Sequence, residues 1–217
     1  EQQGKVTGIA KGAKNSRRRF AGTLEPFVRI RAAFQHRPGT DLVFLLRCEL
    51  DGAWRAFGRD LDRFAAGTAV LELADRMVHG REPGHELFRL VSEALDLLDR
   101  GTACDPLLRA FELHLLAATG YAPMLDQCRG CGHAIGTDAP TYLAPERGGF
   151  LCRPCVRPDE RVREVGRLAG RPLAEAASTA SEGTLTEVAA VTEHLLATVS
   201  PGPLRARAFA ARLRDGT

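Results

Sequence analysis

Four cysteines are the residues of this chain that most narrowly define its chemistry. Cys128 and Cys131 form one C-x2-C pair, and Cys152 and Cys155 form a second pair after a spacer of twenty residues. Each pair can bring two thiolates to one Zn²⁺, and four sulfurs complete a tetrahedral shell. Because no position is then left for water, the pattern predicts one structural zinc ion and argues for a binding protein over a hydrolase.

The spacer, residues 132–151, contains several turn-forming glycines and prolines, so we expect it to fold back as a short hairpin. Two alternatives to zinc are a pair of disulfides or a redox pair. The visible chain has no signal peptide that would indicate export, and redox chemistry needs a single C-x2-C pair. His133 lies beside the second cysteine, but four thiolates already complete the shell. Cys48 and Cys104 fall in apolar stretches and are expected to pack as small hydrophobic residues.

Basic residues gather at the front of the chain. Residues 1–37 contain nine Lys or Arg against two Glu, a net charge of +7, which leaves −4 for the remainder. A basic front attached to an acidic body is typical of a nucleic-acid-binding domain joined to a partner-binding domain. The alternative is a solvated charged surface. The predicted DNA contacts are Lys5, Lys11, Lys14, Arg17, Arg18, Arg19, Arg29 and Arg31.

Aromatic residues accompany these cations. Phe20, Phe27 and Phe34 are candidates to stack on bases, as aromatic side chains do in grooves that follow a single strand. The competing interpretation is that each fills the protein interior, where phenylalanine is most often found. The sequence favours the interior for any one of them.

Three strands are expected around the basic loop, over residues 5–10, 27–34 and 42–50, with a turn at 38–41. Arg29 and Arg31 alternate with apolar neighbours and should therefore share the strand face opposite the core. Three strands with a basic loop suit a five-stranded oligonucleotide-binding (OB-fold) barrel over residues 1–56, whose opening strand we expect to precede Glu1.

The apolar period becomes helical after Gly58. Helices are expected over 61–78 and 87–98, and a third is expected to begin with Asp105 as N-cap and to end at Gly120. Two more are expected beyond Cys155, the first opened by a capping box of Thr184 and Glu187. The fold class is therefore α+β: a barrel, then an all-α domain over 57–217 with a zinc module inserted at 124–157.

Enzyme signatures are missing from the sequence. It contains no phosphate-binding G-x4-G-K-[ST] loop, no H-E-x-x-H zinc motif and no H-x-E ahead of P-C-x-x-C. The six histidines are dispersed, and no nucleophile with its base can be assembled. No run of about 18 apolar residues is present, so no membrane span is expected. We expect a protein that is not an enzyme.

Many short segments, in order along the chain, resemble the RecO family of bacterial recombination mediators. The matching segments are residues 4–14, Phe20, Gly22, 24–27, 41–42, 48–50, 71–73, 87–88, 111–116, 120–123, both cysteine pairs with Gly132, Gly148 and Gly149, and Leu204 with Phe209. Each segment alone is weak evidence. Their order and spacing make the resemblance specific over nearly the whole chain.

The resemblance implies an OB-fold barrel followed by a helical domain with a structural zinc. It also implies a cytoplasmic, nucleoid-associated protein of DNA repair and recombination that binds single- and double-stranded DNA and anneals complementary strands. With RecR, and in many bacteria RecF, such proteins load the RecA recombinase on DNA coated by single-strand-binding protein, whose C-terminal tail is a further expected partner.

Two other functions remain open from the residues themselves. One is a transcriptional regulator that reads DNA through the four-cysteine module. It is disfavoured because the spacer has only one cation, Arg147, too few to follow a phosphate backbone. The other is a protein-interaction scaffold whose basic loop is merely solvated.

Overall fold

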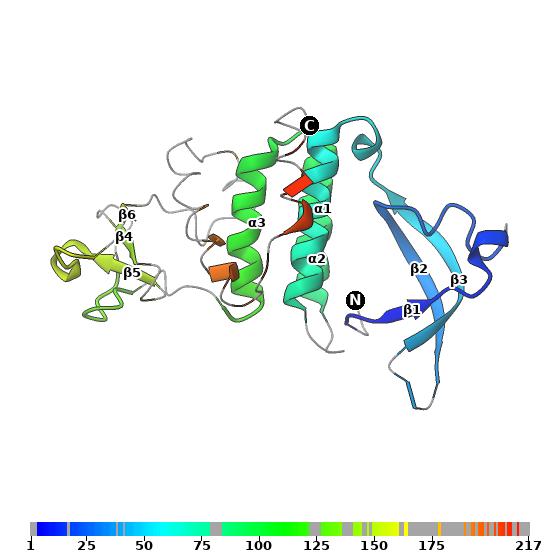
Figure 1. Ribbon diagram of the computed structural model, residues 1–217, viewed down its shortest axis with the longest axis horizontal. Coiled ribbons are helices and arrows are strands. Elements are labelled where there is room, and N and C mark those ends of the chain that lie inside the picture. Colours follow the sequence, from blue (N-terminus) through cyan, green and yellow to red (C-terminus); the bar gives the residue numbers. More distant parts are fainter. Residues whose placement is uncertain are drawn as a thin grey trace.

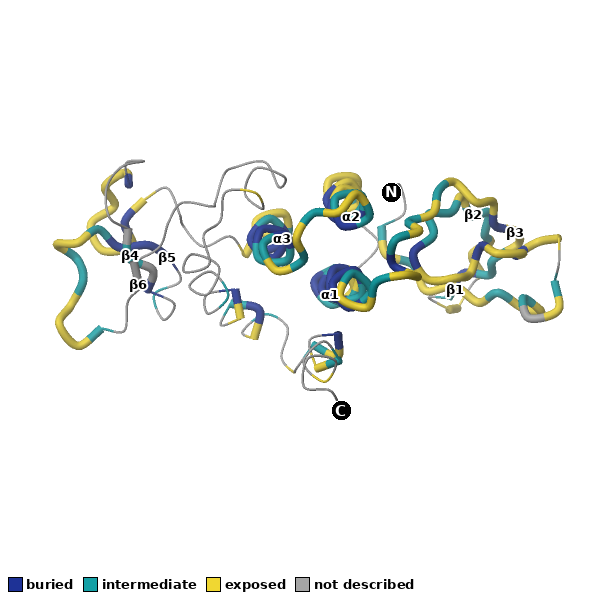
Figure 2. The backbone as a smooth tube through the Cα atoms, turned by 90° about the horizontal axis from the view of Figure 1, so that it is seen from above, coloured by how far each residue is buried: buried dark blue, intermediate teal, exposed yellow. Residues whose placement is uncertain are grey.

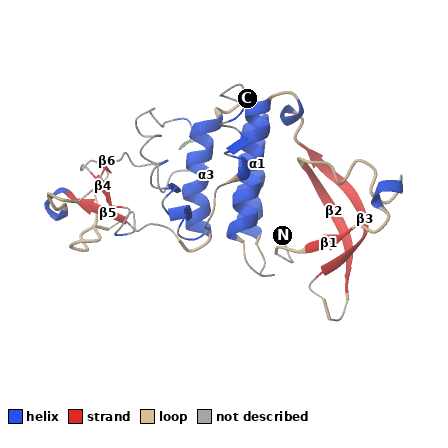
Figure 3. Ribbon diagram, in the orientation of Figure 1, coloured by secondary structure: helices blue, strands red, loops and turns tan. Residues whose placement is uncertain are grey.

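The computed structural model places three blocks in a row: a β-sheet, a group of helices and a small cysteine-containing sheet (Figure 1). It describes residues 4–16, 18–37, 39–40, 42–78, 84–121, 127–135, 141–144, 147, 149–160, 163–164 and fifteen scattered positions from 178 to 212. Strands lie at both ends of the molecule and helices between them (Figure 3). The expected class, a small sheet region followed by a helical domain, is confirmed.

The N-terminal sheet has the strand order β1-β3-β2. Its members are β1 (Thr7–Ile9), β2 (Val28–His36) and β3 (Leu42–Ala53), so all three expected strands form. β1 runs parallel to β3, and β2 runs antiparallel to β3. The β2–β3 register shifts between Arg29 and Ile30 and again between Ala33 and Phe34.

The pairing register separates polar from apolar side chains. Directly paired residues point to the same side of a sheet. One side carries Ile30, Ala32 and Phe34 opposite Leu50, Cys48 and Leu45; we call it the apolar face. The other side, which we call the arginine face, carries Arg29, Arg31 and Gln35 of β2 with Phe44, Arg47 and Glu49 of β3, and Ile9 of β1. The expected common face of Arg29 and Arg31 is therefore confirmed.

Three helices follow, and their buried sides contact one another (Figure 2). They are α1 (Leu61–Met77), α2 (His85–Asp99) and α3 (Cys104–Ala118). Asp60 caps α1 by accepting a hydrogen bond from the Arg63 N–H. The predicted N-cap of α3 is wrong: Ala103 holds that position without a side-chain bond, and Asp105 lies inside the first turn. Pro106 is accommodated there because the first N–H groups of a helix have no partner within it.

An aromatic joint connects the sheet to the helices. The ring of Phe27, which precedes β2, stacks on Phe57 with centroids 4.2 Å apart and meets the edge of Phe64 at 5.3 Å. Phe27 adopts a left-handed backbone with φ of 56°, a conformation that costs free energy in a non-glycine residue. Gly67 of α1 makes room for both rings, since a Cβ there would lie 2.6 Å from Phe57 and 2.7 Å from Phe27.

Hydrogen bonds reinforce the joint. The Trp54 indole donates to Asp96 of α2 at 2.6 Å, and the backbone N–H of Ala56 donates to Asp99 at 2.7 Å. The backbone N–H of Trp54 donates to the Phe27 carbonyl at 3.1 Å. The segment leaving β3 is therefore tied both to the start of β2 and to α2.

Glu72 of α1 forms hydrogen bonds with the C-terminal part of the chain. Its carboxylate accepts hydrogen bonds from the backbone N–H groups of Arg205 and Ala206, at 3.0 and 2.9 Å, and pairs with Arg76 at 2.6 Å. Arg76 also donates to the Gly202 carbonyl at 3.0 Å. Burial raises the pKa of Glu72, but these donors outweigh it, so the pKa lies below its ordinary value.

The cysteine-containing sheet has the order β5-β4-β6. β4 (Thr141–Ala144) pairs antiparallel with β5 (Gly149–Cys152), which confirms the expected hairpin, and β6 (Arg163–Glu164) adds to β4. The predicted capping box of Thr184 and Glu187 lies outside the described residues. Among the helices that the structure describes, none has the length and apolarity to cross a bilayer.

Gly67→Ala should loosen the joint. Alanine gains about 1 kcal/mol over glycine in a helix, but overlap with two buried rings costs about 1–3 kcal/mol, so we expect a net loss in the free energy of unfolding. Chemical denaturation measures it. The control is Gly58→Ala, where an added Cβ meets nothing within 4 Å. Equal stability changes in the two variants would contradict the steric account.

Glu72→Gln should lower the free energy of unfolding at pH 7 by about 1–3 kcal/mol, because two backbone donors and Arg76 lose a carboxylate partner. The lowered pKa of Glu72 means that its stabilisation is present above the ordinary value of 4.5 and is lost as pH falls through the folded value. The difference from wild type should therefore shrink below about pH 4. Glu25→Gln, at an exposed position, is the control. A difference that does not vary with pH would contradict this assignment.

Candidate metal centre and nucleic-acid interface

The four predicted cysteines come together. The Sγ atoms of Cys128, Cys131, Cys152 and Cys155 all lie within 4.8 Å of one another, and those of Cys131 and Cys152 are 3.7 Å apart. Four sulfurs at 2.3 Å from a tetrahedral zinc would be roughly 3.8 Å apart, so the cluster has the size of such a site. His133 is exposed and is not part of the cluster; its backbone carbonyl accepts a hydrogen bond from the Cys128 N–H at 2.8 Å.

Two glycines shape the first knuckle. Gly132 has φ of 74° and donates its N–H to the Cys128 carbonyl, which closes the turn between the first two cysteines. Gly130 lies against the second knuckle, because a Cβ there would come within 2.8 Å of the Cys155 Cβ and 2.9 Å of its sulfur. The Arg129 N–H donates to the Phe150 carbonyl of β5 at 2.8 Å, which joins the two knuckles.

The surroundings of Cys128 favour a thiolate. Its sulfur accepts hydrogen bonds from the backbone N–H groups of Gly130 and Cys152, each at 3.3 Å. Burial raises the pKa of the Cys128 thiol, but the N–H groups of Cys152, Cys131 and Gly130 outweigh it and lower the pKa to about 6. Backbone N–H groups that bond a ligand sulfur are typical of the outer shell of a metal site. Ligand type, spacing and outer shell therefore fit zinc.

The described residues of the module form a small apolar core. Its buried members are Cys128, Ile135, Ala144, Phe150 and Leu151. Leu195, from the helical segment near the end of the chain, packs against this cluster and also against the main core. The cysteine module is thereby attached to the helical domain through a shared side chain.

The predicted DNA-binding residues differ in how far they are available. Lys11 and Arg18 are exposed. Arg19 is exposed too, but its guanidinium donates to the Lys11 carbonyl at 3.1 Å and lies over the Phe20 ring at 5.1 Å, so it helps to close the loop. Arg17 and the side chain of Lys14 lie outside the described residues.

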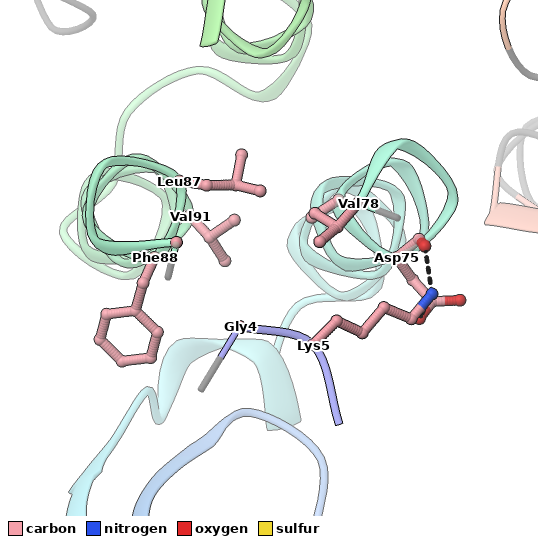
Figure 4. Close-up of a pocket in the computed structure, with 9 residues that line it drawn as sticks. Gly4, Lys5, Asp75, Val78, Leu87, Phe88 and Val91 are labelled. Atoms are coloured by element: carbon pink, nitrogen blue, oxygen red, sulfur yellow. Dashed lines mark hydrogen bonds and ion pairs between the residues drawn. The ribbon is translucent and has the colours of Figure 1, made fainter. Parts of the chain in front are cut away.

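Lys5 faces the helices. Its ammonium group pairs with the Asp75 carboxylate at 2.8 Å and bonds the Asp75 carbonyl near the end of α1. Both residues line a mostly apolar pocket of about 210 Å³, together with Val78, Leu87, Phe88 and Val91 (Figure 4). Lys5 thus connects the sheet domain to α1, and it is not brought together with the loop cations in any contact that the structure describes.

Arg29 and Arg31 share a carboxylate on the arginine face. Asp51 accepts from the Arg29 Nε at 2.9 Å and from the Arg31 guanidinium at 3.0 Å. Asp51 is the residue of β3 left without a Cα partner where the register shifts, so one side chain reaches both arginines. Arg47 lies on the same face, and its Nε is 3.6 Å from a carboxylate oxygen of Glu49.

Arg37 and Arg47 were not among the DNA contacts predicted from the sequence. Arg47 pairs with Ala33 in the same register in which Glu49 pairs with Arg31, so simple alternation along β3 puts it on the arginine face. Phe44 reaches this face only because the register shifts between Ala33 and Phe34, which no spacing in β3 alone reveals. Arg37 directly follows β2 and is separated from Arg29 and Arg31 by even numbers of residues, a spacing that indicates the same face of the strand. Phe44 was missed as an aromatic residue of this face.

Two of the three proposed stacking residues are buried. Phe20 and Phe27 are 4% and 8% exposed, so they fill the interior, as the competing interpretation held. Phe34 is half-buried on the apolar face and contacts the His36 ring edge-on at 5.4 Å. Cys48 is buried beside Thr23, as expected for a small hydrophobic residue, and Cys104 is half-buried.

Comparison with protein families matches the two halves of the chain separately. The family described as recombination protein O N terminal matches residues 1–53, and recombination protein O C terminal matches residues 58–208. The chain belongs to the RecO family. The boundary between the two RecO family matches falls at residues 54–57, where Trp54 and Phe57 contribute to the joint.

Individual relatives support the assignment to the RecO family. A protein named DNA repair protein RecO from Anaeromyxobacter sp. (strain Fw109-5) is 41% identical over 155 residues, which cover 71% of this chain and 60% of the relative. The protein of the same name from Myxococcus xanthus (strain DK1622) is 39% identical over 181 residues, 82% of this chain and 73% of the relative. The chain thus spans about 60% of the length of the Anaeromyxobacter relatives that it matches.

The cysteine cluster should hold one zinc ion per chain, and Cys128→Ser should remove it. The module should then lose its structure, because metal-binding free energy replaces the free energy that its small core does not supply. Metal analysis by mass spectrometry and denaturation measure the two effects. Cys104→Ser, outside the cluster, should keep its metal. Wild-type protein with an intact fold and far less than one zinc would contradict the prediction.

Proposed function

We propose that this chain is a DNA-binding recombination mediator in DNA repair, which binds single- and double-stranded DNA and anneals complementary strands. The observation that carries the proposal is the concentration of cations on one domain, in the basic loop and on the arginine face, in a chain of the RecO family. The proposed DNA contacts are Lys11, Lys14, Arg17, Arg18, Arg29 and Arg31, to which we add Arg37 and Arg47; Lys5 and Arg19 have mainly structural contacts.

Annealing follows from charge neutralisation. Two complementary strands repel each other through their phosphates, and a cationic surface that holds both loosely lowers this repulsion without reading sequence. No cofactor and no nucleotide hydrolysis are needed, so the proposed activity is not enzymatic. Asp51 moderates the surface, because phosphates must compete with its carboxylate for Arg29 and Arg31.

The helical domain is proposed to recruit protein partners. The charge of residues beyond 37 sums to −4, so this part of the chain is a poor general binder of DNA. By family membership the proposed partners are RecR, RecF and the C-terminal tail of single-strand-binding protein, in a cytoplasmic pathway that loads RecA. The proposed domains are residues 1–56 and 57–217, with one structural Zn²⁺ in the module at 124–157.

A DNA-reading role for the cysteine module gains no support. Arg147 of its spacer is paired with Glu160 at 2.8 Å, and the Arg147 carbonyl accepts from Arg129 at 3.1 Å. These contacts hold the hairpin together and occupy the one cation of the spacer. The module is better suited to stabilising its domain.

Removing the exposed loop cations should reduce the salt dependence of DNA binding. Each lost contact with single-stranded DNA flattens the slope of log K against log salt by roughly 0.7, so Lys11→Ala with Arg18→Ala should flatten it by about 1.4.

Asp51→Asn should strengthen DNA binding, because Arg29 and Arg31 lose their competing carboxylate. Fluorescence anisotropy with a labelled oligonucleotide at several salt concentrations measures both.

The control is Arg89→Ala, which removes one exposed cation from α2. Its slope should equal that of wild type. If it flattens the slope as much per charge as the loop substitutions, DNA lies on the helical domain and the proposed division between the domains is wrong.

A further inference from the structure

Phe44 is an aromatic residue on the side of the sheet that faces away from the core. Phe44 pairs with Gln35 of β2 and with Ile9 of β1, which places it on the arginine face. Phe44 is half-buried and belongs to neither apolar core cluster that the described residues form. Phe44 is therefore partly exposed on this face.

Arg37 lies over this ring. The central carbon of its guanidinium is 4.3 Å from the ring centroid, and the side chain is otherwise exposed. A cation at this distance is attracted by the negative face of the ring. The contact holds a flat, cationic group on a flat, aromatic group where β2 ends and β3 begins.

The neighbouring positions are apolar or uncharged. Ile9 and Leu46 are 39% and 49% exposed, and Gln35 is exposed as well. Further along the same face Arg29, Arg31 and Arg47 are paired with Asp51 and Glu49. The arginine face is therefore divided into an ionic part, suited to phosphates, and an aromatic end, suited to a planar group.

We propose that Phe44 and Arg37 form a stacking site for an unpaired base of a single strand whose phosphates contact the arginine face. The inference rests on the proposed function and adds a preference to it. Bases stack on aromatic rings and on guanidinium planes, and stacking accepts every base. In a duplex the bases already stack on one another and their faces are not available. Phe44 and Arg37 therefore favour single strands over duplexes, whereas the cations bind both.

The experiment compares three probes of equal length by fluorescence anisotropy: oligothymidylate, an abasic strand with the same phosphates, and a duplex. Wild type should bind oligothymidylate about tenfold more tightly than the abasic strand, a typical effect of one stacked base. Phe44→Leu should abolish this difference. Its affinity for the abasic strand and the duplex, and its salt slope, should equal those of wild type.

Three further variants test the geometry. Phe44→Tyr keeps the ring and should retain the tenfold preference. Arg37→Lys keeps the charge without the guanidinium plane and should reduce the preference for bases at an unchanged salt slope. Phe34→Leu makes the same replacement on the apolar face and should leave the preference intact.

The results separate the inference from the function on which it rests. If wild type binds no DNA, the proposed function is wrong and the stacking site falls with it. If wild type binds with the expected salt dependence but Phe44→Leu keeps the preference for bases, the proposed function stands and the inference is overturned. Equal losses on all three probes would also overturn it, because they would assign Phe44 to holding the sheet together.

Discussion

The stacking of Phe27 on Phe57 above Gly67 determines how the rest of the molecule is arranged. Phe27 directs its ring into the helices through a left-handed backbone, and β2 begins at the next residue. Because side chains alternate along a strand, this starting point puts Ile30 on the apolar face and Arg29 and Arg31 on the other. Burial of the ring offsets the strained backbone, and the same ring sets which residues face solvent.

The cysteine module depends on a different interaction. Among its described residues only a few are buried, so we expect its stability to come from the four sulfurs and a metal ion bound by them. Gly130 allows the two knuckles to approach, and Leu195 attaches the result to the helical domain. A bound ion would then stabilise one side of the helical domain much as the aromatic joint stabilises the other.

The sequence predicted those features that depend on local spacing. Period-two and helical patterns located three strands and three helices, and the C-x2-C pairs located the sulfur cluster. Features that depend on distant contacts were not predictable. The pairing of Lys5 with Asp75 joins residues far apart in the sequence, and the place of Phe44 on the arginine face depends on a shift in strand register. The N-cap of α3 was misplaced because Asp105 followed by Pro106 resembles a helix start, whereas the first helical turn tolerates both residues inside it.

Under the proposed function, Asp51 affects the time that a DNA strand spends on this surface. A phosphate that bound Arg29 or Arg31 of β2 would displace a carboxylate that is held on the neighbouring strand β3 and cannot diffuse away. The carboxylate therefore remains at a high effective concentration and recaptures the guanidinium whenever the phosphate moves off. We expect such a built-in competitor to speed dissociation more than it slows association, since affinity differences between related complexes arise mostly in the off-rate. In the proposed annealing function the protein must also leave the duplex that the two strands form, and rapid release would meet that need.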